Sequence, residues 1–251
     1  MKGICQLCDR LYVVCDGSNS LRVYHSFQPF SHIEDVEIKE LKSPQDVASC
    51  DKRLLLYISD GSNNCIWRVT TDFMVDRWMD GVGAPFTLSV IAEERFLMSG
   101  ITEDTPSLNI FAPDGALLQR LSLPNDVIDL QHSIQSTTPG NFLVSHGQPR
   151  DDEMTSSRLC EVSKEGQLIR TNSEIVLQPA YIVSDNEGRI IMSDMSRDQI
   201  LMFDRQLKLQ RVLVSPDFDE VRQPQRLCYI SKSGHLLIGS AKGNVHIFCI
   251  R

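Results

Sequence analysis

The sequence has no hydrophobic run that could cross a membrane, and it has few aromatic residues. None of its apolar stretches approaches the roughly 20 residues that a membrane helix requires, and aromatic residues make up only 7% of the 251 positions. Acidic residues outnumber basic ones by 33 to 25, which gives a net charge of −8. RNA-binding surfaces need a basic track with stacking aromatic residues. We therefore expect no membrane insertion, and RNA binding ranks last among the functions considered below.

Local signatures of common enzyme classes are also absent. The sequence contains no Gly-x-Gly-x-x-Gly, no Walker loop and no His-Glu-x-x-His. The Ser-His-Gly at 145–147 is not the tight nucleophile elbow of a hydrolase. We therefore predict neither a nucleotide site nor a local metal motif, and we expect no cofactor.

The first residues and the cysteines indicate a cytoplasmic protein. The start, MKGICQLC, has one lysine, no long apolar stretch and no small-residue cleavage site, so it does not resemble a secretory signal. Eight cysteines are spread along the chain, mostly within apolar runs, which is typical of buried reduced thiols. The Cys5-x-x-Cys8 pair lacks the second pair that structural zinc sites use. We predict buried, reduced thiols and no zinc site.

What the sequence does contain is an internal repeat of six units. In each unit an aliphatic residue opens a first apolar run, and a small residue closes a second run 11 or 12 positions later. A polar turn and a third apolar run follow. The small residues recur at intervals of 40 to 48 positions and are Cys15, Ser59, Ser99, Ser145, Ser193 and Gly239.

This repeat predicts an all-β fold, a six-bladed β-propeller of four-stranded antiparallel blades. The runs are short, rich in β-branched residues and bounded by Gly, Asn, Asp, Ser and Pro, as strands are. Units of this length match propeller blades, and a weaker alternating run after most third runs provides an outer strand. We predict one propeller domain over 1–251, with blades at approximately 1–40, 41–81, 82–124, 125–175, 176–216 and 217–251.

The sixth unit differs from the others because the sequence ends at Arg251, directly after the third run. Either this blade has three strands, or residues that precede Met1 in a longer parent protein supply its fourth strand. An exposed strand edge is an aggregation hazard. We therefore expect the second arrangement.

Two units share one motif most closely. It is carried by Pro44, Val47, Ser59, Asp60, Ile66 and Val69 in the second unit and by Pro179, Ile182, Ser193, Asp194, Ile200 and Phe203 in the fifth. This motif resembles NHL repeats, the propeller units at the end of many tripartite-motif proteins. The third and fourth units depart from the pattern, because Gly100 and His146 stand where an aspartate is expected. No RING or B-box motif is present, so ubiquitin transfer has no support. The resemblance implies a platform that binds protein or RNA.

The predicted binding surface is one mouth of the propeller channel, here called the loop face. It comprises the loops that lead into the inner strands and the turns between second and third strands, and loops on a rigid scaffold often carry function. Fifteen acidic and seven basic residues fall in these segments, which suits a basic protein partner. We expect a monomer that binds such a partner through Lys42, Gln45, Phe86, His132, His146, Asp151, Asp152, Glu153, Tyr181, Arg197, Gln225 and Arg226.

The main prediction is therefore a platform for protein binding without catalysis. The alternative is a propeller hydrolase or lyase, similar to lactonases and amidating lyases, with a metal at the channel mouth. Such enzymes take metal ligands from several blades, so they leave no local motif. We expect the repeated aspartates to cap the turns that follow them rather than to bind a metal. In the enzyme alternative the ligands would be His132, His146, Asp60 and Asp194.

Overall fold

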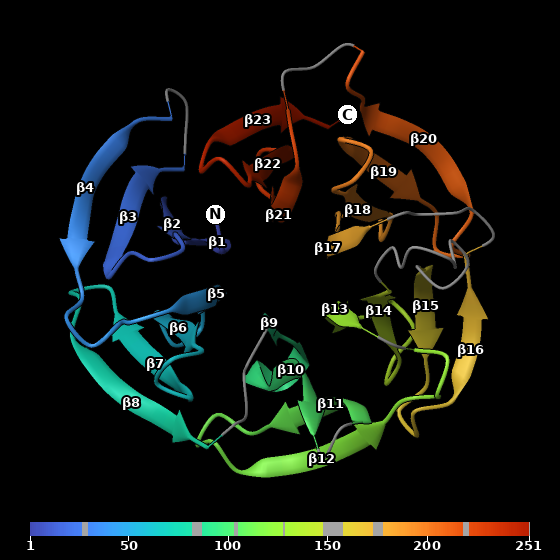
Figure 1. The fold of residues 1–251 in the computed structure, drawn as a ribbon, viewed down its shortest axis with the longest axis horizontal. Coiled ribbons are helices and arrows are strands. Elements are labelled where there is room, and N and C mark those ends of the chain that lie inside the picture. The colour runs from blue at the N-terminus through green and yellow to red at the C-terminus, as the bar shows by residue number, and fades with distance from the viewer. Residues whose placement is uncertain are drawn as a thin grey trace.

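A computed structural model arranges the chain as six β-sheets, the blades, around a common axis (Figure 1). It describes residues 1–26, 30–81, 87–102, 105–127, 129–147, 158–172, 178–217 and 221–250. Within these ranges there are 23 strands, one 3₁₀ turn at Ala92–Glu94 and no α-helix. No helix in the described ranges could therefore span a membrane.

The strands follow one another in chain order within every blade. Blades one and two contain β1 (Gly3–Leu7), β2 (Arg10–Val14), β3 (Ser20–His25) and β4 (His32–Glu37), then β5 (Pro44–Cys50), β6 (Leu55–Asp60), β7 (Cys65–Thr70) and β8 (Val75–Asp80). Blades three and four contain β9 (Thr87–Val90), β10 (Phe96–Thr102), β11 (Thr105–Phe111) and β12 (Leu117–Ser122), then β13 (Leu130–Gln135), β14 (Phe142–His146), β15 (Arg158–Val162) and β16 (Leu168–Thr171). Blades five and six contain β17 (Pro179–Ser184), β18 (Ile190–Asp194), β19 (Gln199–Phe203) and β20 (Leu209–Val214), then β21 (Pro224–Ile230), β22 (His235–Ser240) and β23 (Val245–Cys249).

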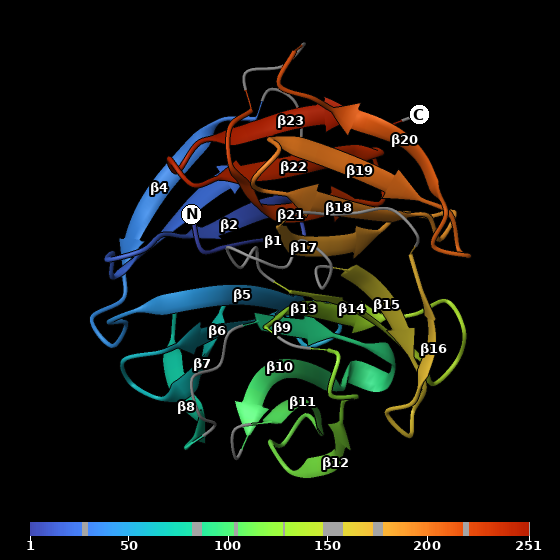
Figure 2. The same ribbon diagram turned by 45° about the vertical axis from the view of Figure 1, so that its right-hand side comes forward.

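The predicted fold class is confirmed. The chain is an all-β propeller with five blades of four antiparallel strands and a sixth blade of three. The first strand of each blade lies nearest the axis and the last lies at the perimeter (Figure 1, Figure 2). The apolar runs of the repeat coincide with the first, second and third strands. Most of these strands are buried on both faces between neighbouring blades, although β3 and β23 are partly exposed.

The hydrophobic core consists of clusters between neighbouring blades. Between blades one and two, Leu7, Val14 and Leu21 pack with Val47 and Ile58, and all five are at most 1% exposed. Each fully buried aliphatic side chain contributes roughly 1.5–3 kcal/mol. A comparable cluster fills each of the other five blade interfaces. Packing around the whole ring therefore holds the inner strands in fixed positions.

Tight turns let the blades approach closely. Gly166, in the turn between β15 and β16, has a φ of 82°, which glycine adopts without strain. A Cβ at this position would lie 2.4 Å from the carbonyl oxygen of Ser122 in the neighbouring blade. The side chain of Gln119 donates to the carbonyl of Lys164 at 2.7 Å in the same region. This turn therefore packs directly against the outer strand of blade three and is hydrogen-bonded to it.

Candidate functional site

Four inner strands carry a β-bulge close to their first residue, at the loop-face end of the channel. The register shifts begin at the proline of β5, β17 and β21 and at Leu130 of β13. A bulge changes the direction of the side chains next to it. The four side chains placed in the channel by these bulges form what we call the central cluster, and they are Asp46, His132, Tyr181 and Arg226.

Asp46 and Arg226 provide the charges of the central cluster. Asp46 is fully buried and accepts hydrogen bonds from the backbone N–H groups of Val47 at 2.9 Å and Leu88 at 3.0 Å. Arg226 Nε lies 3.9 Å from Asp46 Oδ1. Burial raises the pKa of Asp46 to about 6, although Arg226 and the N–H donors oppose this shift. At neutral pH the pair is therefore predominantly ionised and buried.

His132 and Tyr181 provide the rings of the central cluster. The two rings stack with centroids 3.6 Å apart, and the guanidinium of Arg226 lies 5.2 Å from the centre of the Tyr181 ring. The Tyr181 hydroxyl donates to Asp46 Oδ2 at 3.4 Å. The cluster is thus one connected unit that joins blades two, four, five and six.

The hydrogen bonds of His132 determine its tautomer. The Ser89 hydroxyl donates to the carbonyl of Ser133 at 2.7 Å, so it accepts from His132 Nε2, which lies 3.3 Å away. His132 Nδ1 accepts from the N–H of Ile182 at 3.4 Å. Burial, together with the positive charge of Arg226, lowers the pKa of His132 well below 6.5. The ring is therefore neutral, and both nitrogens are already engaged.

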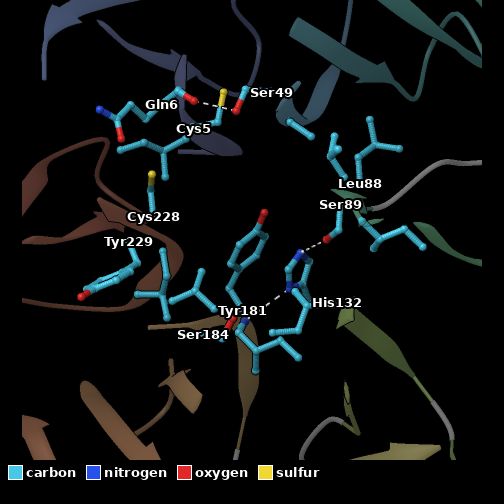
Figure 3. A pocket seen from close by; sticks show the side chains of 18 of the residues that line it. Cys5, Gln6, Ser49, Leu88, Ser89, His132, Tyr181, Ser184, Cys228 and Tyr229 are labelled. Atoms are coloured by element: carbon cyan, nitrogen blue, oxygen red, sulfur yellow. Dashed lines mark hydrogen bonds between the residues drawn. The ribbon is translucent and has the colours of Figure 1, made fainter. Parts of the chain in front are cut away.

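The channel widens beyond the central cluster into a cavity of about 460 Å³. The second halves of all six inner strands line it, and Asp51, Ala92 and Ser231 extend the lining into the turns that follow three of these strands. The cavity therefore opens on the face opposite the loop face, which we call the turn face. Figure 3 shows Tyr181 and His132 side by side, with Cys5 and Cys228 across from them.

The cavity combines apolar walls with a polar rim. Ile4, Leu88, Ile134, Ile182 and Leu227 form the walls. Asp51 is the one charged side chain among the described residues that line the cavity. The rim also carries neutral polar side chains, which include Gln6, Ser49, Gln135, Ser184 and Ser231.

The potential nucleophiles of the cavity are held in their neutral forms. Burial raises the pKa of Cys228 to about 12 and raises that of Cys5 well above 9. Burial, with the charge of Asp46, raises the pKa of Tyr181 well above 10. The thiolate is the reactive form of cysteine. The thiols of Cys5 and Cys228 and the phenol of Tyr181 are therefore protonated at neutral pH.

The predicted binding residues include three members of the central cluster: His132, Tyr181 and Arg226. Sequence reasoning missed the fourth member, Asp46. A signal was nevertheless present, because Asp46, Tyr181 and Arg226 each stand two positions after the repeat proline of their unit. This position varies from unit to unit, whereas the aliphatic position beside it does not.

Four of the remaining predicted residues lie on or near the loop face. Lys42 and Arg197 are exposed there, and Gln45 and Gln225 are half-buried at the bulges of β5 and β21. The amide of Gln45 donates to Ser43 Oγ at 2.9 Å. Four predicted residues lie outside the described ranges, namely Phe86, Asp151, Asp152 and Glu153.

The two histidines of blade four occupy different cavities. His146 lines a space of about 190 Å³ with Asp126, Arg158 and Cys160, away from the channel. Burial lowers the pKa of His146 to about 4, although Asp126 opposes this shift. Its Nδ1 atom has no hydrogen-bond partner among the described residues. His146 and His132 are therefore not placed to share one ligand.

Asp60 caps the turn that follows it, as the capping interpretation of the repeat predicts, whereas the bond described for Asp194 is to the loop that precedes β17. Asp60 accepts the backbone N–H groups of Lys42 at 2.8 Å and of Asn63 at 3.1 Å. Burial alone would raise the pKa of Asp60, but these N–H donors and the Asn63 side chain lower it below 3.8. Asp194 accepts the N–H of Gln178 at 3.2 Å. In the described ranges, no three His, Cys, Asp or Glu side chains gather as they would around a metal ion.

Two further observations refine the expectations from sequence. Several acids of the loop face are paired with bases: Asp16 with Lys2 at 3.6 Å, Asp80 with Arg77 at 3.0 Å and Asp198 with Arg222 at 3.8 Å. Lys2 and Arg77 were not among the seven bases counted in these segments, so including them (fifteen acids against nine bases) reduces the acidic surplus that suggested a basic partner from eight to six. The prediction of buried thiols is wrong for Cys8 and Cys249, which are exposed, while all eight cysteines are unbridged.

Comparisons with known proteins support the propeller fold. No known protein family and no curated protein matches the sequence. A gluconolactonase from Xanthomonas campestris is 12% identical with a TM-score of 0.74, covering 98% of this chain and 84% of that one. Virginiamycin B lyase from Staphylococcus aureus is 9% identical with a TM-score of 0.65 (100% and 84% covered). A chain of a nidogen/laminin complex is 13% identical with a TM-score of 0.69 (90% and 83% covered). Identities this low show the fold alone, and the likeness to NHL repeats stays a resemblance.

Proposed function

We propose that this propeller is a binding protein without catalytic activity, and that a protein partner inserts apolar side chains into the cavity at the turn face. The observation that carries the proposal is the cavity itself. It has apolar walls, a polar rim on which Asp51 is the one charged side chain among the described residues, and a floor that includes His132 and Tyr181, whose hydrogen bonds are already made. Groups in that state can support contact but offer neither a free base nor a nucleophile.

The cavity has the anatomy of a recognition pocket. Protein interfaces concentrate their binding energy in a few anchor side chains that fill desolvated pockets surrounded by polar residues. A volume of about 460 Å³ falls within the range of ligand sites, so it accommodates the tip of a loop. The carboxylate of Asp51 at the rim favours a basic residue beside the apolar anchor. We therefore expect a basic partner whose positive charge contacts the turn face rather than the loop face.

Site-specific photo-cross-linking tests this proposal. A photoreactive phenylalanine replaces Ser184, an exposed residue of the cavity rim, or Asp217, an exposed residue on the loop face. We expect a discrete protein adduct in cell extract from position 184 but not from position 217. Adding Ser231→Trp at the same rim should abolish that adduct without changing thermal stability.

The same experiment tests the residues predicted from sequence. If the partner contacts the loop face through Lys42, Gln45, Arg197 and Gln225, the adduct forms from position 217 and is insensitive to Ser231→Trp. That result would overturn the cavity proposal in favour of the loop face. Equal adducts from both positions, or none from either, would also overturn it.

A further inference from the structure

One turn at the mouth of the cavity holds a large apolar side chain in an unfavourable backbone conformation. Residues 51–54 connect β5 to β6, and Asp51, the first of them, lies on the cavity rim. Leu54, the last, has a φ of 53°, in the left-handed region that branched side chains rarely adopt. Its side chain is 49% exposed. Backbone strain of this kind is concentrated at functional sites, so the turn is a candidate contact surface.

The corresponding turn of blade six shows that this strain is avoidable. It also has four residues, 231–234, and in both turns the N–H of the third residue bonds to the carbonyl of the preceding strand's last residue at 3.2 Å. The last position of the turn in blade six is Gly234, with a φ of 69°. Glycine adopts this conformation without strain. The turn itself therefore does not require a leucine at position 54.

Burial in the core compensates for the same strain at two other positions, but not at Leu54. Among the described residues, three large apolar side chains have a positive φ, namely Leu54, Phe73 and Leu207. Leu207 is 1% exposed within a core cluster, and Phe73 packs against the cluster between blades one and two. The core clusters of the described ranges do not include Leu54. Core packing in this part of the chain therefore does not offset its strain.

The same turn carries charges that complement those of the cavity rim. The side chain of Lys52 is 74% exposed, and its Nζ atom lies 4.0 Å from Glu94, which already pairs with Arg53 at 2.5 Å. Asp51 is exposed and makes no ion pair with a residue in the described ranges. An exposed base and an exposed leucine thus stand two positions apart. They match the basic residue and the apolar anchor that the cavity favours.

We propose that the protein partner of the cavity is a second copy of this chain, and that Leu54 of each copy enters the cavity of the other. This inference rests on the proposed function, because it names the occupant of the same cavity. The leucine and the cavity lie on one face, so two copies related by a two-fold axis make both contacts at once and the assembly closes as a dimer. Lys52 of each copy then approaches the rim that carries Asp51 of the other. Such a dimer replaces the monomer that we expect from the sequence.

Sedimentation equilibrium of the purified 251-residue chain tests this proposal. We expect a concentration-dependent dimer, and we expect Leu54→Ser to raise its dissociation constant by at least about 100-fold. The reason is that each dimer loses two buried leucines, and each is worth roughly tenfold or more. Leu117→Ser is the matched control, because Leu117 is 47% exposed on the outer strand β12. It should leave the dissociation constant unchanged.

Leu54→Gly separates contact with the second copy from support of the local turn. Glycine relieves the strain at a φ of 53°, so the unfolding temperature of the monomeric chain should not fall. Dimerisation should be lost as it is in Leu54→Ser. A lower unfolding temperature would show that the leucine stabilises its own turn, and it would overturn the argument from strain.

A mixture of two variants tests the geometry of the dimer. Ser231→Trp blocks the cavity but keeps Leu54, whereas Leu54→Ser keeps the cavity but lacks the projecting side chain. Neither variant alone can make either contact. An equimolar mixture regains one of the two contacts, so the two variants should associate with each other at least about tenfold more tightly than either associates with itself.

Three results would overturn the proposal. The first is a chain that stays monomeric at the highest concentration measured, and the second is a dimer that Leu117→Ser weakens as much as Leu54→Ser does. The third is a mixture of the two variants that associates no more tightly than each variant alone. Failure here is distinguishable from failure of the proposed function, because a monomeric chain that forms an adduct from position 184 with a different protein would change only the occupant of the cavity.

Discussion

The two ends of the channel are built from the same six strands, yet their chemistry differs. At the loop face a buried ion pair and two stacked rings fill the axis. At the turn face, aliphatic walls surround an open cavity. The repeat fixes an aliphatic residue in the middle of each inner strand, whereas the position just before it holds Asp46, Tyr181 or Arg226. The fold therefore constrains the turn-face end of the channel and leaves the chemistry of the loop-face end to individual residues.

The largest expected effect comes from breaking the ion pair of the central cluster. Asp46→Ala leaves the guanidinium of Arg226, 15% exposed, without its carboxylate. Removing one partner of a buried pair typically costs about 3–5 kcal/mol, because the other charge stays buried. We expect a loss of that size in urea unfolding. Asp16→Ala breaks the exposed pair with Lys2 and should cost less than about 1 kcal/mol. Equal losses in the two variants would contradict the assignment of the cluster as a buried unit.

The second largest expected effect concerns how the free energy of unfolding depends on pH. Because the pKa of Asp46 is raised from 3.8 in the unfolded chain to about 6 in the folded one, the folded chain holds an extra proton between these values. The contribution of Asp46 to the free energy of unfolding is therefore fully present below about pH 4 and is lost as the pH rises through about 6. Asp46→Asn lacks this dependence.

The measurement is urea unfolding of the parent chain and of Asp46→Asn at several pH values. Their difference in stability should change by on the order of 3 kcal/mol between about pH 4 and pH 7, in favour of the parent at the acidic end. The low pKa values of His132 and His146 destabilise both chains on acidification, so their contribution cancels in the difference. Parallel profiles would show that Asp46 titrates normally.

Removing the hydroxyl of the central-cluster tyrosine should lower stability by less than breaking the ion pair does, but by more than the same change in a tyrosine of the cavity lining. Tyr181→Phe removes the hydrogen bond to Asp46 but keeps the ring that stacks on His132. A hydrogen bond of this kind is worth about 1 kcal/mol, and somewhat more when the acceptor is charged. Tyr229→Phe, on the cavity lining, serves as the control and should change stability by less than about 0.5 kcal/mol. A larger loss from Tyr229→Phe would mean that the polar groups of the cavity also hold the ring together.

The same contrast explains what could be predicted from the sequence. The strands were predictable, because the apolar runs at 55–58 or 189–192 recur at fixed spacing whatever the turns contain. The capping contacts of Asp60 were also predictable, because the aspartate precedes a turn in several units. Three members of the central cluster were predicted as residues of the channel mouth, but their contacts with Asp46 were not, because a bulge at Gln45 or Gln225 shifts the register by one residue without an apolar signature. The position of the cavity depends on how far Tyr181 and Arg226 fill the axis, which no local pattern expresses.

The smallest expected effect is the response to metal ions, and it decides between the binding function and the hydrolase or lyase alternative. Of the predicted ligands, His132 has both nitrogens engaged, Asp60 is bonded to backbone N–H groups and His146 lies in a separate cavity. Ca²⁺ and Zn²⁺ should therefore leave the unfolding temperature unchanged. An ion that binds only the folded state, present at a concentration 100 times its Kd, would add about 2.7 kcal/mol to the free energy of unfolding, which is readily measured.

Because Cys8 and Cys249 are exposed and thiolates bind zinc, the experiment uses a chain with both replaced by serine. A stabilisation that His132→Ala abolishes would require the histidine to give up its bond to Ser89 or Ile182. It would make the loop-face end of the channel, rather than the cavity, the working site of this propeller.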